Sequence, residues 1–363
     1  MILKLRYREV LEVKSLFIMG TPASGKTAIA VGLALKFSRE GYRVAYFKPV
    51  GSSRATREED EDGVLMKSVL GMDHSLNDIV PYTVGPSYLS GSRNCISLED
   101  IMSSYRKVSD GADIVIVGGA GFPHIMGCVG LDSITLARKL KSVAIFLVHI
   151  ENDFSVDNAI FINSYLECRG IPIAGNIFNN VSRPLLAKAE GIYRSLLEEK
   201  GYRSLGVIPH LPEIASPTVS EYHQALGGEI LSGEEHMGNL IEDVIIGAMT
   251  IESALGYLRR APNKAVITGG DRADIALAAL ETSTSALILT GGLYPDVKVI
   301  ARAHEKQIPV LLVHYDTYTT LEKCAEVSRR IHPSERRSIE AAVENVEKYV
   351  DWTGILKTVG PGV

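Results

Sequence analysis

The segment from Gly20 to Thr27 constrains this chain most, because it reads Gly-Thr-Pro-Ala-Ser-Gly-Lys-Thr and fits the pattern GxxxxGK[ST] in full. An apolar run at residues 16–19 precedes it, and a helical pattern at residues 26–39 follows it. A strand, a glycine-rich loop and a helix in this order direct backbone N–H groups and a helix N-terminus at an anion. We therefore predict that the loop binds the phosphates of a nucleotide such as ATP.

Two side chains of this loop have distinct predicted roles. Lys26 is expected to reach the β- and γ-phosphates, and the Thr27 hydroxyl is expected to ligate Mg²⁺. The glycines allow the backbone to turn tightly around the phosphates. The predicted cofactor-binding residues of the loop are Gly20, Thr21, Pro22, Ala23, Ser24, Gly25, Lys26 and Thr27.

The rest of the first half alternates short apolar runs with longer helical patterns. The apolar runs are continuous, which is typical of parallel strands covered by helices on both faces. We therefore predict an α/β fold with a P-loop parallel sheet. Its predicted strands are residues 16–19, 44–47, 114–117, 143–148, 173–178 and 204–208.

A second, smaller βα alternation follows a stretch rich in Pro, Gly and Glu. We place the domain boundary near Thr218 and expect Ser334 to cap a final helix over residues 334–350. The predicted strands of this second part are residues 265–268, 286–290 and 310–313. The predicted domains are 1–217, which binds nucleotide, 218–352, which is a smaller βα domain with the C-terminal helix, and 353–363, which is a tail.

The second part contains a short internal repeat. Thr268-Gly269-Gly270 and Thr290-Gly291-Gly292 each stand where a predicted strand ends, and an aspartate follows each at the same offset. Glycine pairs at such places allow tight turns or a close approach of the backbone to another group. The pairs are therefore expected either to shape the turns or to contact a ligand or a second subunit.

Composition narrows the classes of partner. The formal charge of −5 gives no basic character, so nucleic acid is not the expected partner. No apolar run approaches the ~20 residues that span a bilayer, and charged residues interrupt the N-terminal segment, so we expect a cytoplasmic protein without a membrane contact. The cysteines lack metal-ligand spacing and are expected to be reduced and mostly buried; they are Cys95, Cys128, Cys168 and Cys324.

An acidic partner for the metal is missing at its usual place. The predicted strand 114–117 ends in Gly118-Gly119-Ala120-Gly121, without a carboxylate. The acidic run at residues 58–62 is expected to be mostly a solvated loop. Asp62 stands apart from the run because it directly precedes an apolar helical pattern, so it is the candidate metal ligand.

At this point several motifs, taken in order, resemble a known family. Residues 17–212 resemble dethiobiotin synthetase and the amino-terminal domain of long phosphotransacetylases, and residues 218–324 resemble the DRTGG domain. The matching segments are the phosphate loop, Phe47-Lys48-Pro49-Val50, Pro81-Tyr82, Val117-Gly118-Gly119-Ala120-Gly121, Gly175-Asn176-Ile177-Phe178-Asn179, Leu205-Gly206-Val207-Ile208-Pro209 and Gly270-Asp271-Arg272-Ala273-Asp274, with the later turns Thr290-Gly291-Gly292 and Tyr315-Asp316-Thr317-Tyr318-Thr319-Thr320.

The resemblance implies roles for three further residues. It implies an adenine contact from Asn179, metal binding by Asp62, and a Lys48 that holds the carbamate or carboxylate of a substrate. The chain departs from the synthetase at Gly118, where the family has a metal-binding Glu, and its phosphate loop is one residue shorter. Loss of a carboxylate weakens a metal clamp for phosphoryl transfer.

Two functions therefore remain open. The chain is either a nucleotide-dependent regulatory or sensor protein, whose second domain binds a partner or small effector, or an ATP-dependent ligase with Lys26 and Lys48 as catalytic residues. Whether it is an enzyme, for example an ATPase, stays undecided. The resemblance also implies a homodimer, although the final helix and Trp352 are equally able to pack on their own domain.

Overall fold

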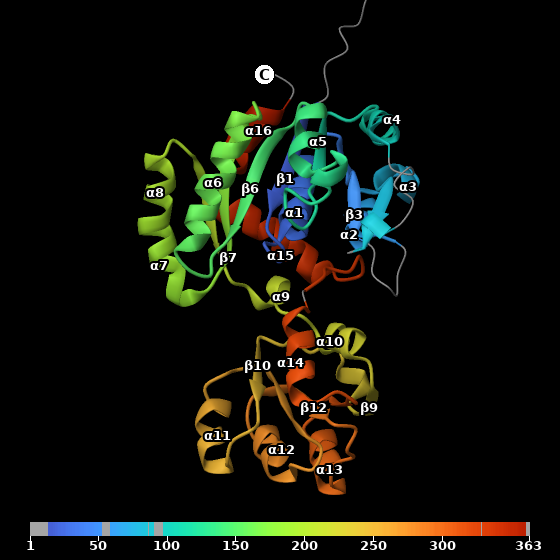
Figure 1. Ribbon diagram of the computed structural model, residues 1–363, viewed down its shortest axis with the longest axis vertical. Coiled ribbons are helices and arrows are strands. Elements are labelled where there is room, and N and C mark those ends of the chain that lie inside the picture. The colour runs from blue at the N-terminus through green and yellow to red at the C-terminus, as the bar shows by residue number, and fades with distance from the viewer. Residues whose placement is uncertain (1–13, 53–58, 86, 91–96, 328, 361–363) are drawn as a thin grey trace, which may run out of the picture. The chain divides into compact units, whose positions relative to one another are not determined.

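The computed structural model describes residues 14–52, 59–85, 87–90, 97–327 and 329–360. Within these residues the chain divides into two compact units (Figure 1). The first comprises the described residues up to His210 and from Ile331 onward, and the second comprises Leu211–Arg330. Both units are α/β structures, as predicted.

The first unit is built on a parallel sheet with the order β2-β5-β1-β6-β7-β8. All of β5 and nearly all of β1 are buried, because helices cover both faces of the sheet. All six predicted strands are confirmed, with ends within three residues of the prediction. Their bounds are β1 (Lys14–Gly20), β2 (Val44–Phe47), β5 (Ile114–Gly118), β6 (Val143–His149), β7 (Ile173–Val181) and β8 (Ser204–Pro209).

The helices lie on opposite faces because the connections run in opposite directions. The connection through α1 crosses β5 to reach β2, whereas the later connections step toward β8, and right-handed crossovers then place them on the other face. A small parallel pair, β3 (Val50–Ser52) and β4 (Tyr82–Val84), accompanies the sheet. The helices before the second unit are α1 (Lys26–Arg39), α2 (Glu61–Leu70), α3 (Leu76–Ile79), α4 (Leu98–Ser109), α5 (Ser133–Lys139), α6 (Phe154–Cys168), α7 (Leu186–Lys188) and α8 (Arg194–Glu199).

The C-terminal segment returns to the first unit. Helix α15 (Arg336–Tyr349) packs along α1, and α16 (Trp352–Val359) packs on β1 and β7 (Figure 1). The backbones of α1 and α15 approach closely, because a Cβ added at Gly32 would lie 2.5 Å from the Ala342 carbonyl oxygen.

Ion pairs also join these helices, with 3.0 Å between Lys36 Nζ and Glu347 Oε1 and 2.7 Å between Arg39 Nη2 and Glu340 Oε2. The prediction that the final helix belongs to the second domain is therefore wrong. The predicted cap at Ser334 is also wrong, since Glu335 immediately precedes α15. The predicted tail contains the ordered helix α16.

The second unit is a five-stranded sheet in the order β10-β11-β12-β13-β9, with β9 antiparallel at one edge. Alternate strand residues enter two cores, one under α11, α12 and α13 and the other under α10 and α14. The three predicted strands are confirmed, whereas β9 and β10 were not predicted. The elements are α9 (Pro212–Ala215), α10 (Val219–Leu226), β9 (Glu229–Ser232), β10 (Asp243–Ile246), α11 (Ile251–Leu258), β11 (Lys264–Gly269), α12 (Ala273–Leu280), β12 (Thr284–Thr290), α13 (Val297–Glu305), β13 (Val310–Leu312) and α14 (Thr317–Ala325).

The repeated glycine pairs shape turns that pack against each other. A Cβ at Gly270 would lie 1.7 Å from the carbonyl oxygen of Leu293, so only glycine fits there. Gly291 and Gly292 both have positive φ, and their N–H groups donate to the carbonyl oxygens of Tyr315 and Val313. These contacts support the first of the two predicted roles, the shaping of turns.

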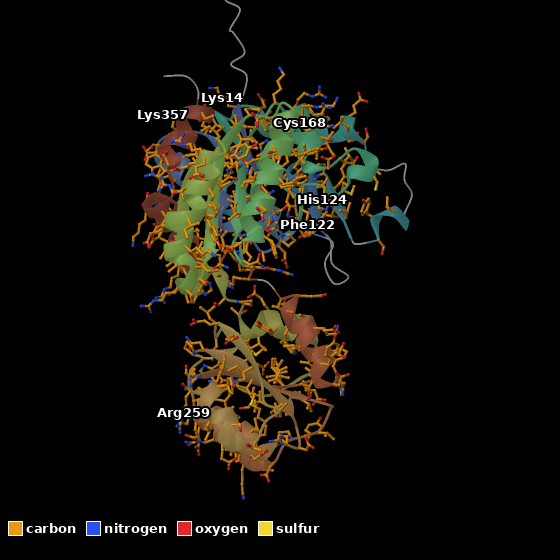
Figure 2. All side chains as sticks on the ribbon, turned by 60° about the vertical axis from the view of Figure 1, so that its left-hand side comes forward. Lys14, Phe122, His124, Cys168, Arg259 and Lys357 are labelled. Atoms are coloured by element: carbon orange, nitrogen blue, oxygen red, sulfur yellow. The ribbon has the colours of Figure 1, made fainter. Side chains whose placement is uncertain are left out.

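The cysteines differ from the prediction. Cys324 is buried, but Cys128 and Cys168 are exposed, and Figure 2 shows Cys168 at the end of α6. Cys95 lies outside the described residues. A thiol at a helix end is accessible because its side chain has no layer packed over it, so the expectation of mostly buried thiols is wrong. Within the described ranges, none of the helices has both the length and the apolar character needed to cross a bilayer.

The close contact between α1 and α15 predicts the effect of Gly32→Val. Because the added side chain would meet backbone at Ala342, we expect the first unit to lose about 1–3 kcal/mol of stability. Trp352 is the single tryptophan and lies in α16, so its fluorescence during urea unfolding measures this loss. Gly191→Val is the control, since nothing lies within 4 Å of a Cβ there. Equal stability of both variants would contradict the predicted packing.

A buried lysine also distinguishes the second unit. Lys264 has no solvent exposure, and its ammonium group donates to the Thr282 hydroxyl at 2.9 Å and the Ser283 carbonyl at 2.8 Å. Both acceptors are uncharged. Burial therefore lowers the pKa of Lys264 to about 8, with only a smaller opposing effect from Asp243.

This lowered pKa predicts a pH dependence of stability. Between about pH 8 and 10.5, the unfolded chain binds more protons at Lys264 than the folded chain does, so its contribution to the free energy of unfolding rises with pH. We expect wild type to gain stability relative to Lys264→Met across this range. Urea unfolding followed by circular dichroism measures both proteins. Parallel pH profiles would show that Lys264 titrates normally in the fold.

Candidate functional site

The phosphate loop joins β1 to α1, as the sequence predicted. Gly25 precedes the helix with a φ of 81°, and Ala23 also has a positive φ of 56°. Gly20 must lack a side chain, because a Cβ there would lie 2.5 Å from Ser24 Oγ and 2.9 Å from the Leu147 carbonyl oxygen. The backbone is therefore held in the tight turn that a phosphate-binding loop requires.

The Lys26 side chain lies over this loop. Its Nζ donates to the Thr21 carbonyl at 2.7 Å and to the Gly121 carbonyl at 3.2 Å, which joins the loop to the segment after β5. Burial lowers the pKa of Lys26 to about 8, although the charge of Asp62 opposes this and that of Lys48 adds a smaller lowering. A half-buried ammonium group that donates to two carbonyls is suited to receive an anionic phosphate.

A chain of polar contacts runs from α1 to α2 beside the loop. The Thr27 hydroxyl donates to Asp62 Oδ1 at 2.7 Å, and Lys48 Nζ donates to Asp62 Oδ2 at 2.6 Å and to Asp60 Oδ2 at 2.8 Å. Asp60 also caps α2 by accepting the Gly63 N–H. The structure therefore brings together three predicted residues, Thr27, Lys48 and Asp62, and adds Asp60, which the sequence analysis missed.

Asp60 was missed because it lies in the acidic run that was expected to be solvated. It is only 2% exposed, so that expectation is wrong for this residue, whereas Glu59 is exposed. A capping signal was present in the sequence, because an aspartate directly before a helical pattern is a favoured N-cap. Glu58 of the run lies outside the described residues.

The opposite charges of this cluster shift the pKa values of Lys48 and Asp62. Burial alone would lower the pKa of Lys48, but the charges of Asp62 and Asp60 outweigh it and hold that pKa above its usual range. Burial would likewise raise the pKa of Asp62, but the adjacent Lys48 outweighs it and the pKa is lowered. Lys48 and Asp62 are therefore ionised at neutral pH, and Lys48 is a buried partner of two carboxylates.

The place beside Gly118 is filled by a tyrosine. A Cβ added at Gly118 would lie only 2.2 Å from Tyr46 Oη, so the hydroxyl from β2 occupies the space where a side chain at the end of β5 would begin. No sequence pattern indicates this contact, since Tyr46 lies in an ordinary apolar strand pattern. It arises because β2 and β5 are neighbours in the sheet, with Tyr46 opposite Ile116.

Asn179, the predicted adenine contact, lies against the back of the phosphate loop. Its Nδ2 donates to the Ser24 carbonyl at 2.9 Å, and its side chain leaves no room for a Cβ at Gly25. The side chain is 7% exposed. In this position Asn179 holds the loop in place. Its contact with an adenine base stays a prediction.

The residues present fit a divalent cation that arrives with a nucleotide. Thr27 and Asp62 place a hydroxyl and a carboxylate side by side, and the Asp62 side chain is 32% exposed. Mg²⁺ is typically held by one or two such groups together with phosphates and water. In the part of the chain that the structure describes, no cluster of three or more His, Cys, Asp or Glu side chains is arranged to hold a metal alone.

Comparison with known families agrees with this geometry. Residues 14–218, more than half of the chain, match the AAA domain family, and residues 221–327 match the DRTGG domain. The chain belongs to the AAA domain family. The predicted combination of a P-loop domain with a DRTGG domain is therefore confirmed.

This AAA domain protein is similar to two kinds of curated protein. It is 26% identical to a phosphate acetyltransferase of Nitratidesulfovibrio vulgaris over 93% of this chain and 50% of that protein. It is also 26% identical to the ATP-dependent dethiobiotin synthetase BioD of Bacillus subtilis subsp. natto over 57% of this chain and 92% of the synthetase. The chain spans about half the length of the acetyltransferases that it matches.

Among the solved structures that are similar to part of this chain is one with a DRTGG domain. It comprises the CBS and DRTGG domains of the regulatory region of a Clostridium perfringens pyrophosphatase, in complex with the activator diadenosine tetraphosphate. The TM-score is 0.29 at 19% identity, over 42% of this chain and 74% of that one.

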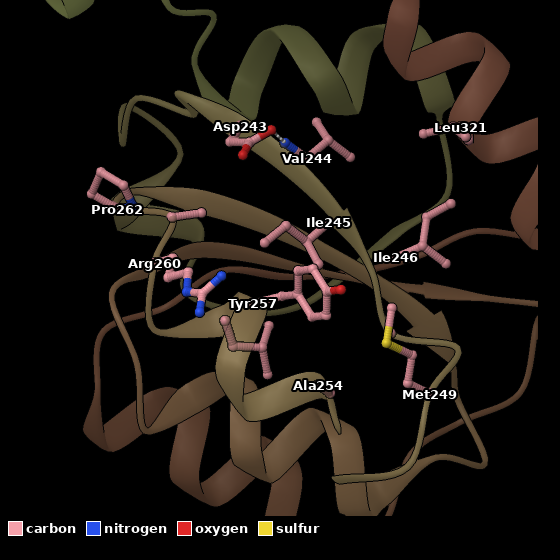
Figure 3. A pocket seen from close by; sticks show the side chains of 13 residues that line it. Asp243, Val244, Ile245, Ile246, Met249, Ala254, Tyr257, Arg260, Pro262 and Leu321 are labelled. Atoms are coloured by element: carbon pink, nitrogen blue, oxygen red, sulfur yellow. Dashed lines mark hydrogen bonds between the residues drawn. The ribbon is translucent and has the colours of Figure 1, made fainter. Parts of the chain in front are cut away.

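A separate cavity of about 690 Å³ lies in the DRTGG unit of the AAA domain protein, along the edge strand β10 (Figure 3). Ile245 and Tyr257 form part of its apolar wall, while Asp243 and Arg260 contribute opposite charges. Such a lining suits a small molecule with an apolar body and a polar end. The predicted effector of this domain stays a prediction.

The lowered pKa of Lys26 predicts how nucleotide affinity depends on pH. A bound phosphate raises this pKa, so binding takes up a proton when the free amine is neutral, and affinity falls as the pH rises above about 8. We expect ATP affinity to drop between pH 7.5 and 9.5, by at most about tenfold per pH unit. Calorimetric titration at several pH values measures it. A constant affinity would show that Lys26 is fully protonated in the free protein.

Proposed function

We propose that this protein binds ATP at residues 20–27 and acts as a nucleotide-dependent regulatory or sensor protein. The observation that carries the proposal is the state of Lys48. This lysine is 5% exposed and is paired with Asp60 and Asp62, so it holds the phosphate site together rather than facing an acceptor. A site with a complete phosphate loop but no free acceptor lysine favours binding over group transfer.

The nucleotide would be held by groups with separate tasks. The loop N–H groups and the Lys26 ammonium group bind the phosphates, and Asn179 keeps the loop in place by its bond to Ser24. When bound, Mg²⁺ would neutralise phosphate charge, and Thr27 and Asp62 are the residues that would hold it. We also propose that the bound nucleotide carries an adenine base and that the protein is cytoplasmic.

The fold offers a route by which the nucleotide site acts on the second unit. Helix α1 begins at the phosphate loop, and α15, which packs along it, follows the second unit directly in the chain. A shift of α1 on binding would therefore reach α15 through the contact of Gly32 with Ala342. We also propose that the second unit binds a small effector or a protein partner, and that the protein forms a homodimer.

A second candidate function is an ATP-dependent ligase that activates a carboxylate or carbamate. The observation that favours it is the 26% identity to a dethiobiotin synthetase over nearly all of that enzyme. Lys48 is present, and its Nζ lies 2.6 Å from Asp62 Oδ2, beside the phosphate loop. Its ion pairs would have to open before it could hold a substrate anion.

Titration of the full chain with ATP and ADP, with and without Mg²⁺, tests the proposal. We expect binding that Lys26→Ala weakens about 10- to 100-fold, because a charge-assisted contact contributes about 1.5–3 kcal/mol. Phosphate release should be slow and should not respond to added carboxylates. Absence of binding by folded wild type would disprove the proposal. Release that carboxylates stimulate, and that Lys26→Ala abolishes, would establish the ligase instead.

A further inference from the structure

The cavity along β10 has a charged end and an apolar end. Asp243, the first residue of β10, lies opposite Lys264 of the parallel strand β11. Helix α11 runs back along the strands that it connects, so Arg260, just after this helix, lines the same end of the cavity as Asp243. Met249, after β10, and Ala254, in the first half of α11, line the other end. The cavity therefore suits a ligand whose charge is confined to one end.

The two charged side chains differ in their partners. Asp243 Oδ1 accepts the N–H of Val244 at 2.8 Å, and the neighbour of Asp243 in β11 is the buried cation Lys264. By contrast, no side chain among the described residues forms an ion pair or a hydrogen bond with the Arg260 guanidinium group. Figure 3 shows the Arg260 side chain extending into the cavity from the turn after α11. Arg260 is therefore the charged group that is open to a ligand.

The apolar lining is incompletely covered by the protein itself. Met249 and Tyr257 are 43% and 55% exposed, although both line the cavity together with the partly buried Ile245. A ligand with an apolar body would remove part of this surface from water, which is favourable in proportion to the apolar area covered. The lining therefore favours a ligand whose larger part is apolar.

The dimensions favour a small molecule over an added peptide strand. The volume of about 690 Å³ lies within the range of small-molecule sites, about 300–1,000 Å³. The edge strand β10 has only four residues, and the N–H of Val244 is already bonded to Asp243. It therefore offers little backbone to an extended peptide, which would bind mainly through main-chain hydrogen bonds.

The single open guanidinium group favours a single negative charge. A carboxylate matches the guanidinium fork with two parallel hydrogen bonds. A phosphate monoester would bring about two negative charges at neutral pH against one open cation, with the Asp243 carboxylate at the same end of the cavity. An amine would be repelled by Arg260. A carboxylate is therefore the head group that the charges suit best.

We propose that the cavity of the second unit binds a monocarboxylate with an apolar body, whose carboxylate contacts Arg260 and whose body lies against Ile245 and Tyr257. This inference rests on the part of the proposed function in which the second unit binds a small effector, and it names the chemical class of that effector.

Calorimetric titration of the full chain with four eight-carbon probes tests the head group. The probes are octanoate, octanol, octylamine and octyl phosphate, each below its micelle concentration. We expect octanoate to bind most tightly, about three- to tenfold more tightly than octanol, because Arg260 is exposed and its charge-assisted contact is partly screened. Hexanoate should bind about tenfold more weakly than octanoate, because two fewer methylene groups are buried. Tighter binding of octylamine or octyl phosphate than of octanoate would overturn the assigned class.

Two arginines that are adjacent in the chain provide a matched pair of variants. Arg260→Gln should reduce the affinity for octanoate to that for octanol and leave the affinity for octanol unchanged. Arg259→Gln is the control, because Arg259 is also exposed but does not line the cavity, and it should bind octanoate as wild type does. Equal effects of the two substitutions would overturn the inference, because the carboxylate would then respond only to general surface charge.

A third variant tests the apolar wall. Tyr257→Ala removes a side chain that is more than half exposed, so the fold is retained, and we expect octanoate and octanol to bind more weakly by the same factor. Unchanged affinities would place the probes elsewhere and overturn the inference. Titration with ATP keeps the two proposals apart. Nucleotide binding without octanoate binding would overturn this inference alone, whereas octanoate binding without nucleotide binding would support it and overturn the nucleotide site.

Discussion

The buried ion pairs of Lys48 with Asp60 and Asp62 hold together the segments beside the phosphate loop. They connect the end of β2 to the start of α2, and Asp62 in turn accepts the hydroxyl of Thr27 at the start of α1. The starts of α1 and α2 and the end of β2 are therefore held beside one phosphate loop. Because these charges are largely buried, each depends on its partners, and removal of one would leave another uncompensated.

In the proposed function, the same cluster favours binding over turnover. A phosphate loop supplies N–H groups and the Lys26 ammonium group. These donors suit a triphosphate whether or not it is later hydrolysed. Group transfer needs in addition an acceptor site and enough cationic charge near the leaving oxygens. Here Lys48 is paired with two carboxylates, and Gly118 at the end of β5 carries no side chain.

The second unit is an insertion in the chain of the first. The chain leaves the first unit after His210 and returns at Ile331, so that α15 packs on the helix that follows the phosphate loop. Glycine at position 32 permits this close contact of two helix backbones. Both ends of the inserted unit therefore continue into the first unit.

The sequence by itself determined the phosphate loop and the strands of both sheets that have continuous apolar runs. It also determined the position of Asp62 at the start of a helix. Each of these features depends on local spacing and polarity. It did not determine the place of α15, since an amphipathic helix carries no record of which apolar surface will cover it. Nor did it determine that Asp60 is buried or that Tyr46 fills the space at Gly118. Those facts were decided by the tertiary structure, in which the order of strands brings distant residues to a common edge and burial assigns each charge its partner.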